Sequence, residues 1–145
     1  MTIEEKIWTT LKNYNFTDYA VAGIMGNLFA ESALKSNNLE DTKNRTYGMS
    51  DEVYTSSVDN GTYPFTKFVN DGAGYGLAQW TSADRKKNLY YSCKGQGVSI
   101  SDINCQLALL YKEVIDYGLF NKLNNANNIQ DASTIFLTQF ERPAD

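Results

Sequence analysis

The sequence predicts an α+β domain that is predominantly helical, with a central helix and a long irregular insertion that forms at most a small β-hairpin. Segments with apolar residues at helical spacing occur toward both ends of the chain. The most apolar segment, residues 19–32, carries large side chains on one side and only glycine and alanine on the other. A helix of this kind is expected to be packed on both sides. Between residues 35 and 80, asparagine and glycine interrupt the periodicity.

The first two helices are marked by capping residues. Thr2 and Glu5 form a capping-box pattern at the start of a helix over residues 2–13, and Thr17 caps the helix over 19–32. Their buried residues are expected to be Ile3, Ile7, Trp8 and Leu11 in the first helix and Val21, Ile24, Met25, Leu28 and Phe29 in the second. Each glycine on the other side of the second helix costs about 1 kcal/mol relative to alanine. We therefore expect another segment to approach that side closely.

The remaining elements follow from similar signals. Helices are expected near residues 53–58 after a Ser50 cap, from a Ser82 cap to Gly95 or Gly97, from Ser101 to Gly118, and over 129–141 with Pro143 as terminator. The asparagine-rich stretch 121–128 is expected to be a loop. Arg85, Lys86 and Lys87 are expected to form a solvated helix face. With 42% hydrophobic residues among 145, the chain is expected to form a single domain, residues 1–145, with its own core.

Composition excludes several kinds of function. The absence of histidine removes histidine-dependent hydrolases and histidine-ligated zinc sites. Cys93 and Cys105 are too few to build a metal site by themselves, so no metal and no cofactor is predicted. A net charge of −4 gives no electrostatic support for binding nucleic acid. The chemistry that remains is that of carboxylates.

Glu31 is the carboxylate in the most unusual position. It ends the apolar helix, beside Leu28 and one turn past Asn27. A carboxyl at such a rim is partly desolvated, which favours its protonated form. A protonated carboxyl is the general acid that glycoside cleavage needs. From position alone, however, a solvated glutamate just past the core is the more common case.

A glycine-rich motif follows at residues 74–80, Gly-Tyr-Gly-Leu-Ala-Gln-Trp. Gly74 and Gly76 permit positive φ and a close approach of the backbone to a ligand. Gln79 offers both donors and an acceptor to an acetamido group. Tyr75 and Trp80 are the best of the nearby aromatic residues for supporting the face of a sugar. Taken alone, the motif is more simply a turn that precedes the next helix.

Together, the segment Ala30-Glu31-Ser32-Ala33-Leu34 and the 74–80 motif resemble the lysozyme superfamily, in particular its goose-type lysozyme and lytic transglycosylase branch. The resemblance is closest to the phage tail lysozyme family, and it continues through residues 85–86, 99–100 and 140–143. It implies a lysozyme-like fold with a substrate cleft and a peptidoglycan glycosidase with Glu31 as its catalytic acid. It also implies that Ser32 supports Glu31. The residues it implies in the lining of the sugar cleft are Gly76, Leu77 and Gln79.

A second catalytic carboxylate is not evident from the sequence. The candidates are Asp51, Asp59, Asp71 and Glu141. Glu141 stands before Arg-Pro at a helix end and could fold back toward Glu31, whereas Asp51 is more simply a first-turn acid. Retaining and inverting glycosidases need two carboxyl groups at a fixed separation. A lytic transglycosylase can act with one, so we expect cleavage of the MurNAc–GlcNAc bond of the transglycosylase type, with a muramidase close behind.

Two alternatives stay open at this point: an N-acetylglucosaminidase that cuts the GlcNAc–MurNAc bond, and a wall-binding module that has lost catalysis. The expected partner is the glycan strand of bacterial peptidoglycan, with no nucleic acid and no membrane. We expect a monomer, with further lysin or wall-binding domains in a longer protein. Because no signal peptide is visible, delivery to the cell wall is expected by a holin, a phage tail or host lysis.

Overall fold

The computed structural model describes residues 1–141. This part of the chain forms two compact units: unit 1 contains residues 1–34 and the chain from 107 onward, and unit 2 contains residues 35–106. Both units are helical, and no β-sheet occurs within residues 1–141. None of the helices in this part of the chain has the length and hydropathy needed to cross a bilayer.

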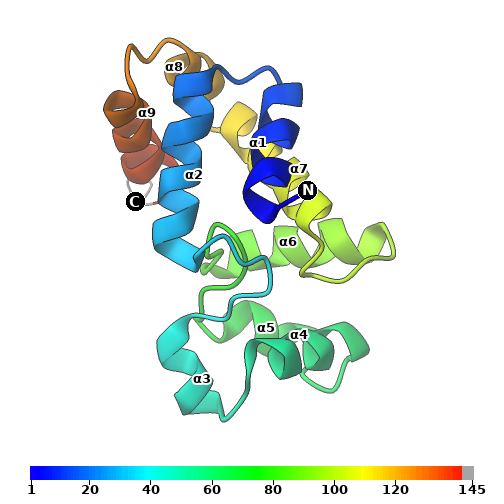
Figure 1. Ribbon diagram of the computed structural model, residues 1–145. Coiled ribbons are helices and arrows are strands. Elements are labelled where there is room, and N and C mark those ends of the chain that lie inside the picture. Colours follow the sequence, from blue (N-terminus) through cyan, green and yellow to red (C-terminus); the bar gives the residue numbers. More distant parts are fainter. Residues whose placement is uncertain (142–145) are drawn as a thin grey trace. The chain divides into compact units, whose positions relative to one another are not determined.

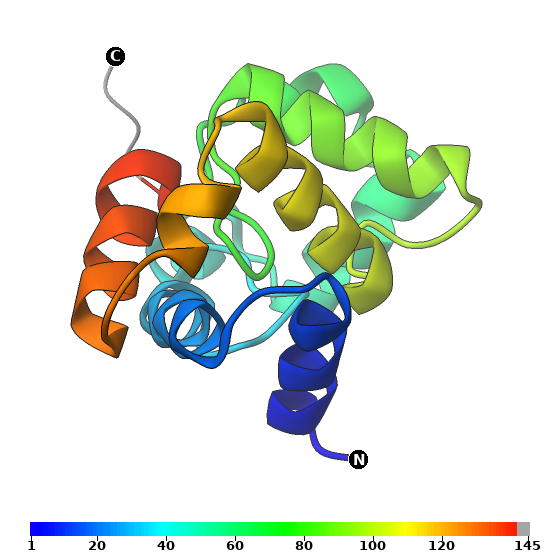
Figure 2. The same ribbon diagram turned by 90° about the horizontal axis from the view of Figure 1, so that it is seen from above.

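Unit 1 is arranged around its longest helix. Its elements are α1 (Ile3–Asn13), α2 (Asp18–Ser32), the part of α7 (Ile103–Asp116) that begins at Leu107, α8 (Phe120–Asn124), α9 (Ile129–Phe136) and the π-helical turn η1 (Leu137–Glu141). Helix α2 lies between α1 and α9 in both views (Figures 1 and 2). The expected central helix is therefore present within this unit.

Helices α2 and α9 pack closely because Gly23 has no side chain. A Cβ atom at Gly23 would lie 2.6 Å from the backbone nitrogen of Ser133 and 2.8 Å from the Cβ of Ala132. One turn later, the buried Asn27 donates from Nδ2 to the carbonyl oxygens of Gly23 (2.9 Å) and Ser133 (3.0 Å). The close neighbour expected on the glycine side of this helix is thus α9. Gly26, in contrast, has no neighbouring atom within 4 Å of an added Cβ.

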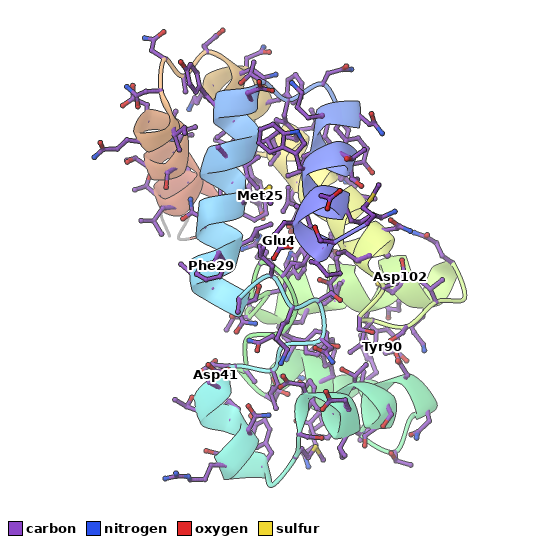
Figure 3. The ribbon with its side chains drawn as sticks, viewed as in Figure 1. Glu4, Met25, Phe29, Asp41, Tyr90 and Asp102 are labelled. Carbon is purple, nitrogen blue, oxygen red and sulfur yellow. The ribbon has the colours of Figure 1, made fainter. Side chains whose placement is uncertain are left out.

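The apolar stripe of α2 is narrower than expected. Val21, Ile24 and Leu28 are fully buried, but Met25 is only half-buried and Phe29 is 64% exposed. Figure 3 shows Met25 on the side of α2 that faces α1, across a shallow groove from Glu4. Because α1 covers only part of α2, the residues at the edge of the stripe stay accessible.

The capping signals of unit 1 are confirmed. Thr2 and Glu5 form the reciprocal capping box of α1, and the Thr17 hydroxyl accepts from the N–H of Ala20 at the start of α2. In α1, Ile7 and Leu11 are buried as expected. Two residues were expected in the core and are not, since Ile3 is 49% and Trp8 37% exposed. Helix α1 therefore buries one narrow face.

Unit 2 corrects the expected α+β class. Its helices are α3 (Asp41–Tyr47), α4 (Asp51–Asn60), α5 (Phe65–Asn70) and α6 (Ala83–Gly95). The expected irregular or β insertion is wrong, because three of these helices fill it. Extended pairing in residues 1–141 is limited to isolated bridges of Tyr75 with Leu39 and with Trp80. Two glycines of this region end helices: Gly48 and Gly61 are left-handed C-caps of α3 and α4.

Three smaller expectations also change. The stretch 121–128 contains most of α8 instead of a plain loop. Helix α7 begins at Ile103, where Asp102 Oδ2 accepts from the N–H of Cys105 (2.9 Å), so the cap lies one residue after the expected Ser101. Lys86 is completely buried, not solvated, because it is ion-paired with Asp71. The expected stop at Pro143 lies outside the described residues.

Candidate functional site

Glu31 lies in the last turn of α2 and is half-buried. Helical spacing puts it one turn past Asn27, on the flank of α2 that faces α9. The helix then ends abruptly: Ala33 is left-handed (φ 54°, ψ 31°), donates its N–H to the Phe29 carbonyl (2.8 Å), and is followed by Leu34, also left-handed (φ 61°). Non-glycine residues in this region are strained and persist where surrounding packing imposes them. The path of the chain directly after Glu31 is therefore imposed by its surroundings.

Ser32 secures the turn that carries Glu31. Its side chain is buried, and its hydroxyl donates to the carbonyl oxygen of Leu28 (2.9 Å). This bond ties the C-terminal turn of α2 to the preceding turn. The bond fixes the backbone next to Glu31, and the support of the Glu31 side chain by Ser32, which the resemblance implies, stays a prediction.

The 74–80 motif is a tightly closed turn in unit 2. Tyr75 and Trp80 exchange two backbone hydrogen bonds of 3.0 Å each, and the N–H of Gln79 donates to the Gly76 carbonyl (3.1 Å). Gly76 and Gln79 both have positive φ, at 82° and 55°. The N–H of Gly76 donates outward to the Asn38 carbonyl (2.9 Å). The turn is therefore a preformed structure joined to the segment before α3.

A glutamine that the sequence did not single out explains the glycine at position 76. Gln106 Oε1 accepts from the N–H of Leu77 (2.9 Å), and its Nε2 donates to the carbonyl of Ser36 (2.7 Å). A Cβ at Gly76 would lie 2.9 Å from this amide group. Gly76 and Leu77 are both buried. Their N–H groups are bonded inside the protein, and the expectation that their backbone lines a sugar site stays a prediction.

Gln79 also differs from the expectation. Its Nε2 donates to the carbonyl oxygens of Asn38 (2.9 Å) and Gly76 (3.0 Å), which uses both amide hydrogens. Its Oε1 lies against Gly74, where an added Cβ would be only 2.7 Å away. The residue is half-buried. The side chain can therefore offer a ligand its acceptor oxygen and not, as expected, its donors.

Tyr75 and Trp80 belong to the core of unit 2. Both side chains have 0% exposed surface. The Tyr75 hydroxyl forms a short hydrogen bond with the Thr55 hydroxyl, and burial raises the pKa of Tyr75 above its ordinary value. The expected exposed sugar platforms are thus absent at these two residues, because large rings gain more from burial.

Three of the four expected second carboxylates are engaged in holding unit 2 together. Asp51 accepts hydrogen bonds from Lys35, Asn44 and the N–H of Leu39. Asp59 accepts from Ser99, Lys94 and the N–H of Ile100. Asp71 accepts from Tyr54, Tyr63, Lys86 and the N–H of Ala73. Burial opposes ionisation of Asp51, but its hydrogen bonds prevail and lower its pKa. All three acids have structural partners on several segments.

Glu40 is a carboxylate that the sequence pattern does not reveal. Its Oε1 accepts from the N–H of Gly74 (3.0 Å), its own N–H donates to the Gly74 carbonyl (2.8 Å), and its Oε2 accepts from Thr42 (3.0 Å). The side chain is half-buried at the start of α3. A glutamate before a helix is ordinary in sequence, and only the fold brings it onto the turn.

Glu141, the fourth candidate, is the last residue of η1 and is half-buried. It belongs to unit 1, as Glu31 does. Single π-helical turns occur frequently at functional sites. The approach of Glu141 to Glu31 stays a prediction, and the Arg-Pro pair that follows lies outside the described residues.

A carboxylate at the end of an apolar helix, in a chain that has no histidine, fits the carboxylate chemistry by which lysozymes degrade peptidoglycan. Sequence comparison assigns the chain within that class. The family model for phage tail lysozyme matches residues 2–145, so the chain belongs to the phage tail lysozyme family. Comparisons with curated proteins and with solved structures found no match. Family membership confirms the resemblance seen in the sequence and implies a lysozyme-like activity on the bacterial cell wall.

Proposed function

We propose that this protein cleaves the β-1,4 glycan backbone of peptidoglycan at the MurNAc–GlcNAc bond, with Glu31 as general acid. The observation that carries the proposal is the family match over residues 2–145, together with Glu31 in the Glu-Ser pair at the end of α2. A half-buried carboxyl on a helix whose last turn is fixed by Ser32 and Ala33 supports this role. A general acid must keep one orientation relative to the leaving oxygen.

The hydrogen bonds that the aspartates make within unit 2 favour a mechanism with one acid. Asp51, Asp59 and Asp71 each hold other segments of unit 2 through several hydrogen bonds. Using any of them as a base or nucleophile would break those bonds. Glu31 then protonates the leaving glycosidic oxygen, the C6 hydroxyl of the muramic acid attacks the anomeric carbon, and the hydroxyl proton returns to the carboxylate. The product is a 1,6-anhydromuramic end, the outcome of a lytic transglycosylase.

A second candidate is hydrolysis of the same bond by a muramidase, with Glu141 as the second carboxylate. Glu141 is half-buried and belongs to the same unit as Glu31. As a base it would activate a water molecule, and the product would be a reducible muramic acid end. In either case Gln79 Oε1 would accept a hydrogen bond from an acetamido N–H or a sugar hydroxyl.

Digestion of purified peptidoglycan, followed by mass spectrometry of the fragments, separates these outcomes. Anhydro ends are lighter than hydrolysed ends by one water molecule and resist borohydride reduction. Reducible MurNAc ends would show a muramidase, and reducible GlcNAc ends an N-acetylglucosaminidase. Binding to walls without any release of fragments would show a wall-binding module.

The acid itself is tested with Glu31→Gln, which keeps the shape of the side chain but cannot deliver its proton. Lysis should fall by about 10²-fold or more with folding preserved. Glu52→Gln, at an exposed position in the first turn of α4, is the matched control and should leave lysis unchanged. Glu141→Gln should abolish hydrolysis if Glu141 is the base and have little effect on anhydro product. A folded and fully active Glu31→Gln protein would contradict the assignment.

Delivery to the wall belongs to the same proposal. A phage tail, a holin or host lysis would each bring the enzyme to peptidoglycan. A tail route is the one that the family description favours. Immunogold labelling of purified virions would test it, because an enzyme released only by a holin would be absent from the particle.

A further inference from the structure

Lys86 is a buried cation that the proposed chemistry does not use. It lies on α6 with 0% of its surface exposed. Its ammonium group pairs with Asp71 Oδ1 (2.6 Å) and donates to the Tyr54 hydroxyl (3.1 Å) and to the carbonyl of Ala73 (2.8 Å). The same nitrogen lies 4.2 Å from the ring centre of Phe68. Three oxygens thus receive the three hydrogens of the ammonium group.

Asp71 completes a network around this cation. Its Oδ2 accepts from the hydroxyls of Tyr54 (2.6 Å) and Tyr63 (2.8 Å), and its Oδ1 also accepts from the N–H of Ala73 (2.9 Å). Tyr47, on α3, donates to the Asp71 carbonyl (3.1 Å). Charge and hydrogen-bonding capacity are therefore matched on both members of the pair.

Stability alone is a weak reason for such a pair. Removing two charges from water is expensive, and well-packed apolar residues of similar volume often give equal or greater stability. Burial lowers the pKa of Lys86, against the opposing effect of Asp71, which reflects that desolvation. A charged pair is most useful where it fixes a geometry that apolar packing would leave loose.

The geometry that the pair fixes is the backbone of Ala73, in the two peptide groups on either side of its Cα. Asp71 holds its N–H and Lys86 holds its carbonyl. Ala73 directly precedes Gly74, the residue against which the Oε1 atom of Gln79 is packed. A shift of Ala73 would therefore move Gly74 and displace the acceptor oxygen of Gln79.

We propose that Lys86 and Asp71 are positioning residues that fix the start of the 74–80 turn and thereby the acceptor oxygen of Gln79. The inference rests on the proposed function in so far as Gln79 contacts the glycan. The anchoring of the turn does not depend on that function and is measurable without substrate.

The test uses Lys86→Met/Asp71→Asn, a double variant without the two charges and with nearly the same volume. The turn amides of Gly74, Gly76 and Leu77 should exchange hydrogen at least tenfold faster than in the wild type, while the amides of α2 keep their rates. Lys12→Met is the matched control, because Lys12 also pairs with an aspartate (Asp18) and a backbone carbonyl but belongs to unit 1. It should change neither turn exchange nor lysis.

Activity adds a second readout. In the double variant kcat/KM for wall lysis should fall at least tenfold, and Gln79→Ala added to it should cause no further loss, since both act through one contact. A folded double variant with wild-type turn exchange and wild-type lysis would overturn the proposal. So would additive effects of Gln79→Ala and the double variant.

The remaining outcomes also decide the matter. If the double variant fails to fold, the wild type is measured alone: turn amides that exchange as slowly as those of α6 support the anchoring, and turn amides that exchange much faster refute it. If the wild type does not lyse walls, the proposed function fails, and amide exchange still tests whether the pair holds the turn.

Discussion

Gly23→Ala tests the close packing of α2 on α9. In an open helix, alanine is more favourable than glycine by about 1 kcal/mol. At Gly23, however, the new Cβ would meet Ser133 N at 2.6 Å, Ala132 Cβ at 2.8 Å and Ala132 C at 2.9 Å. Two of these atoms are backbone and cannot move without shifting α9, and overpacking of this kind costs about 1–3 kcal/mol. The free energy of unfolding of the variant should therefore lie between the wild-type value and a value about 2 kcal/mol lower.

Gly26→Ala, one turn later on the same helix, provides the matched control. Nothing lies within 4 Å of its added Cβ, so the full propensity gain of about 1 kcal/mol should appear. The two variants should differ in free energy of unfolding by about 1–3 kcal/mol. This difference measures the steric cost at Gly23, because the gain in helix propensity is the same in both variants. Urea denaturation followed by circular dichroism measures it, with an unchanged slope showing that only stability has changed. Equal stabilisation by both substitutions would refute the close approach of the helices.

Three other predictions concern charge, metals and thiols. Asp51→Asn should make the free energy of unfolding less dependent on pH in the acid range. The pKa of Asp51 is lowered in the fold, so its contribution to stability is present above about pH 4 and is lost as the pH falls through the folded pKa. Acid titration of the melting temperature checks this, and an unchanged profile would contradict it. Lysis should survive EDTA at constant ionic strength, since the chain has no histidine; loss of lysis that a divalent ion restores would reveal an oxygen-ligand site. Cys93 and Cys105 are free, buried and 2.9 Å apart at sulfur, so both should react with iodoacetamide after denaturation without reductant, and no labelling would show a disulfide.

Helix starts and ends could be predicted because their signals are local. Thr2, Thr17, Ser50 and Ser82 each cap a helix through a bond to a residue three positions later. The class of unit 2 could not be predicted in the same way. Its asparagines and glycines are equally compatible with loops and with the ends of short helices, and tertiary packing decides between them.

In the candidate site, too, local features could be predicted from the sequence and long-range contacts could not. The place of Glu31 at the end of an apolar helix follows from helical spacing, and the structure agrees with it. The burial of Gly76 depends on Gln106, which lies about 30 positions further along the chain and has no pattern to mark it. The sequence predicts that Lys86 is a surface residue, because only the fold brings Asp71 close to it. Such pairings between distant segments carry no periodic signal.

The division of the chain between the units has a consequence for its synthesis. Unit 2 is one continuous stretch, whereas unit 1 needs both the first 34 residues and those from 107 onward. At about 5–20 residues per second, a ribosome needs several seconds to make the stretch between them. During that time α2 exists without α9, and its glycine flank has no neighbour. Unit 2 can therefore fold first, and the helix that carries Glu31 acquires its packing only after α9 has been made. We expect ribosome-bound chains to be inactive until that point, which would keep a wall-degrading enzyme inert while it is being made.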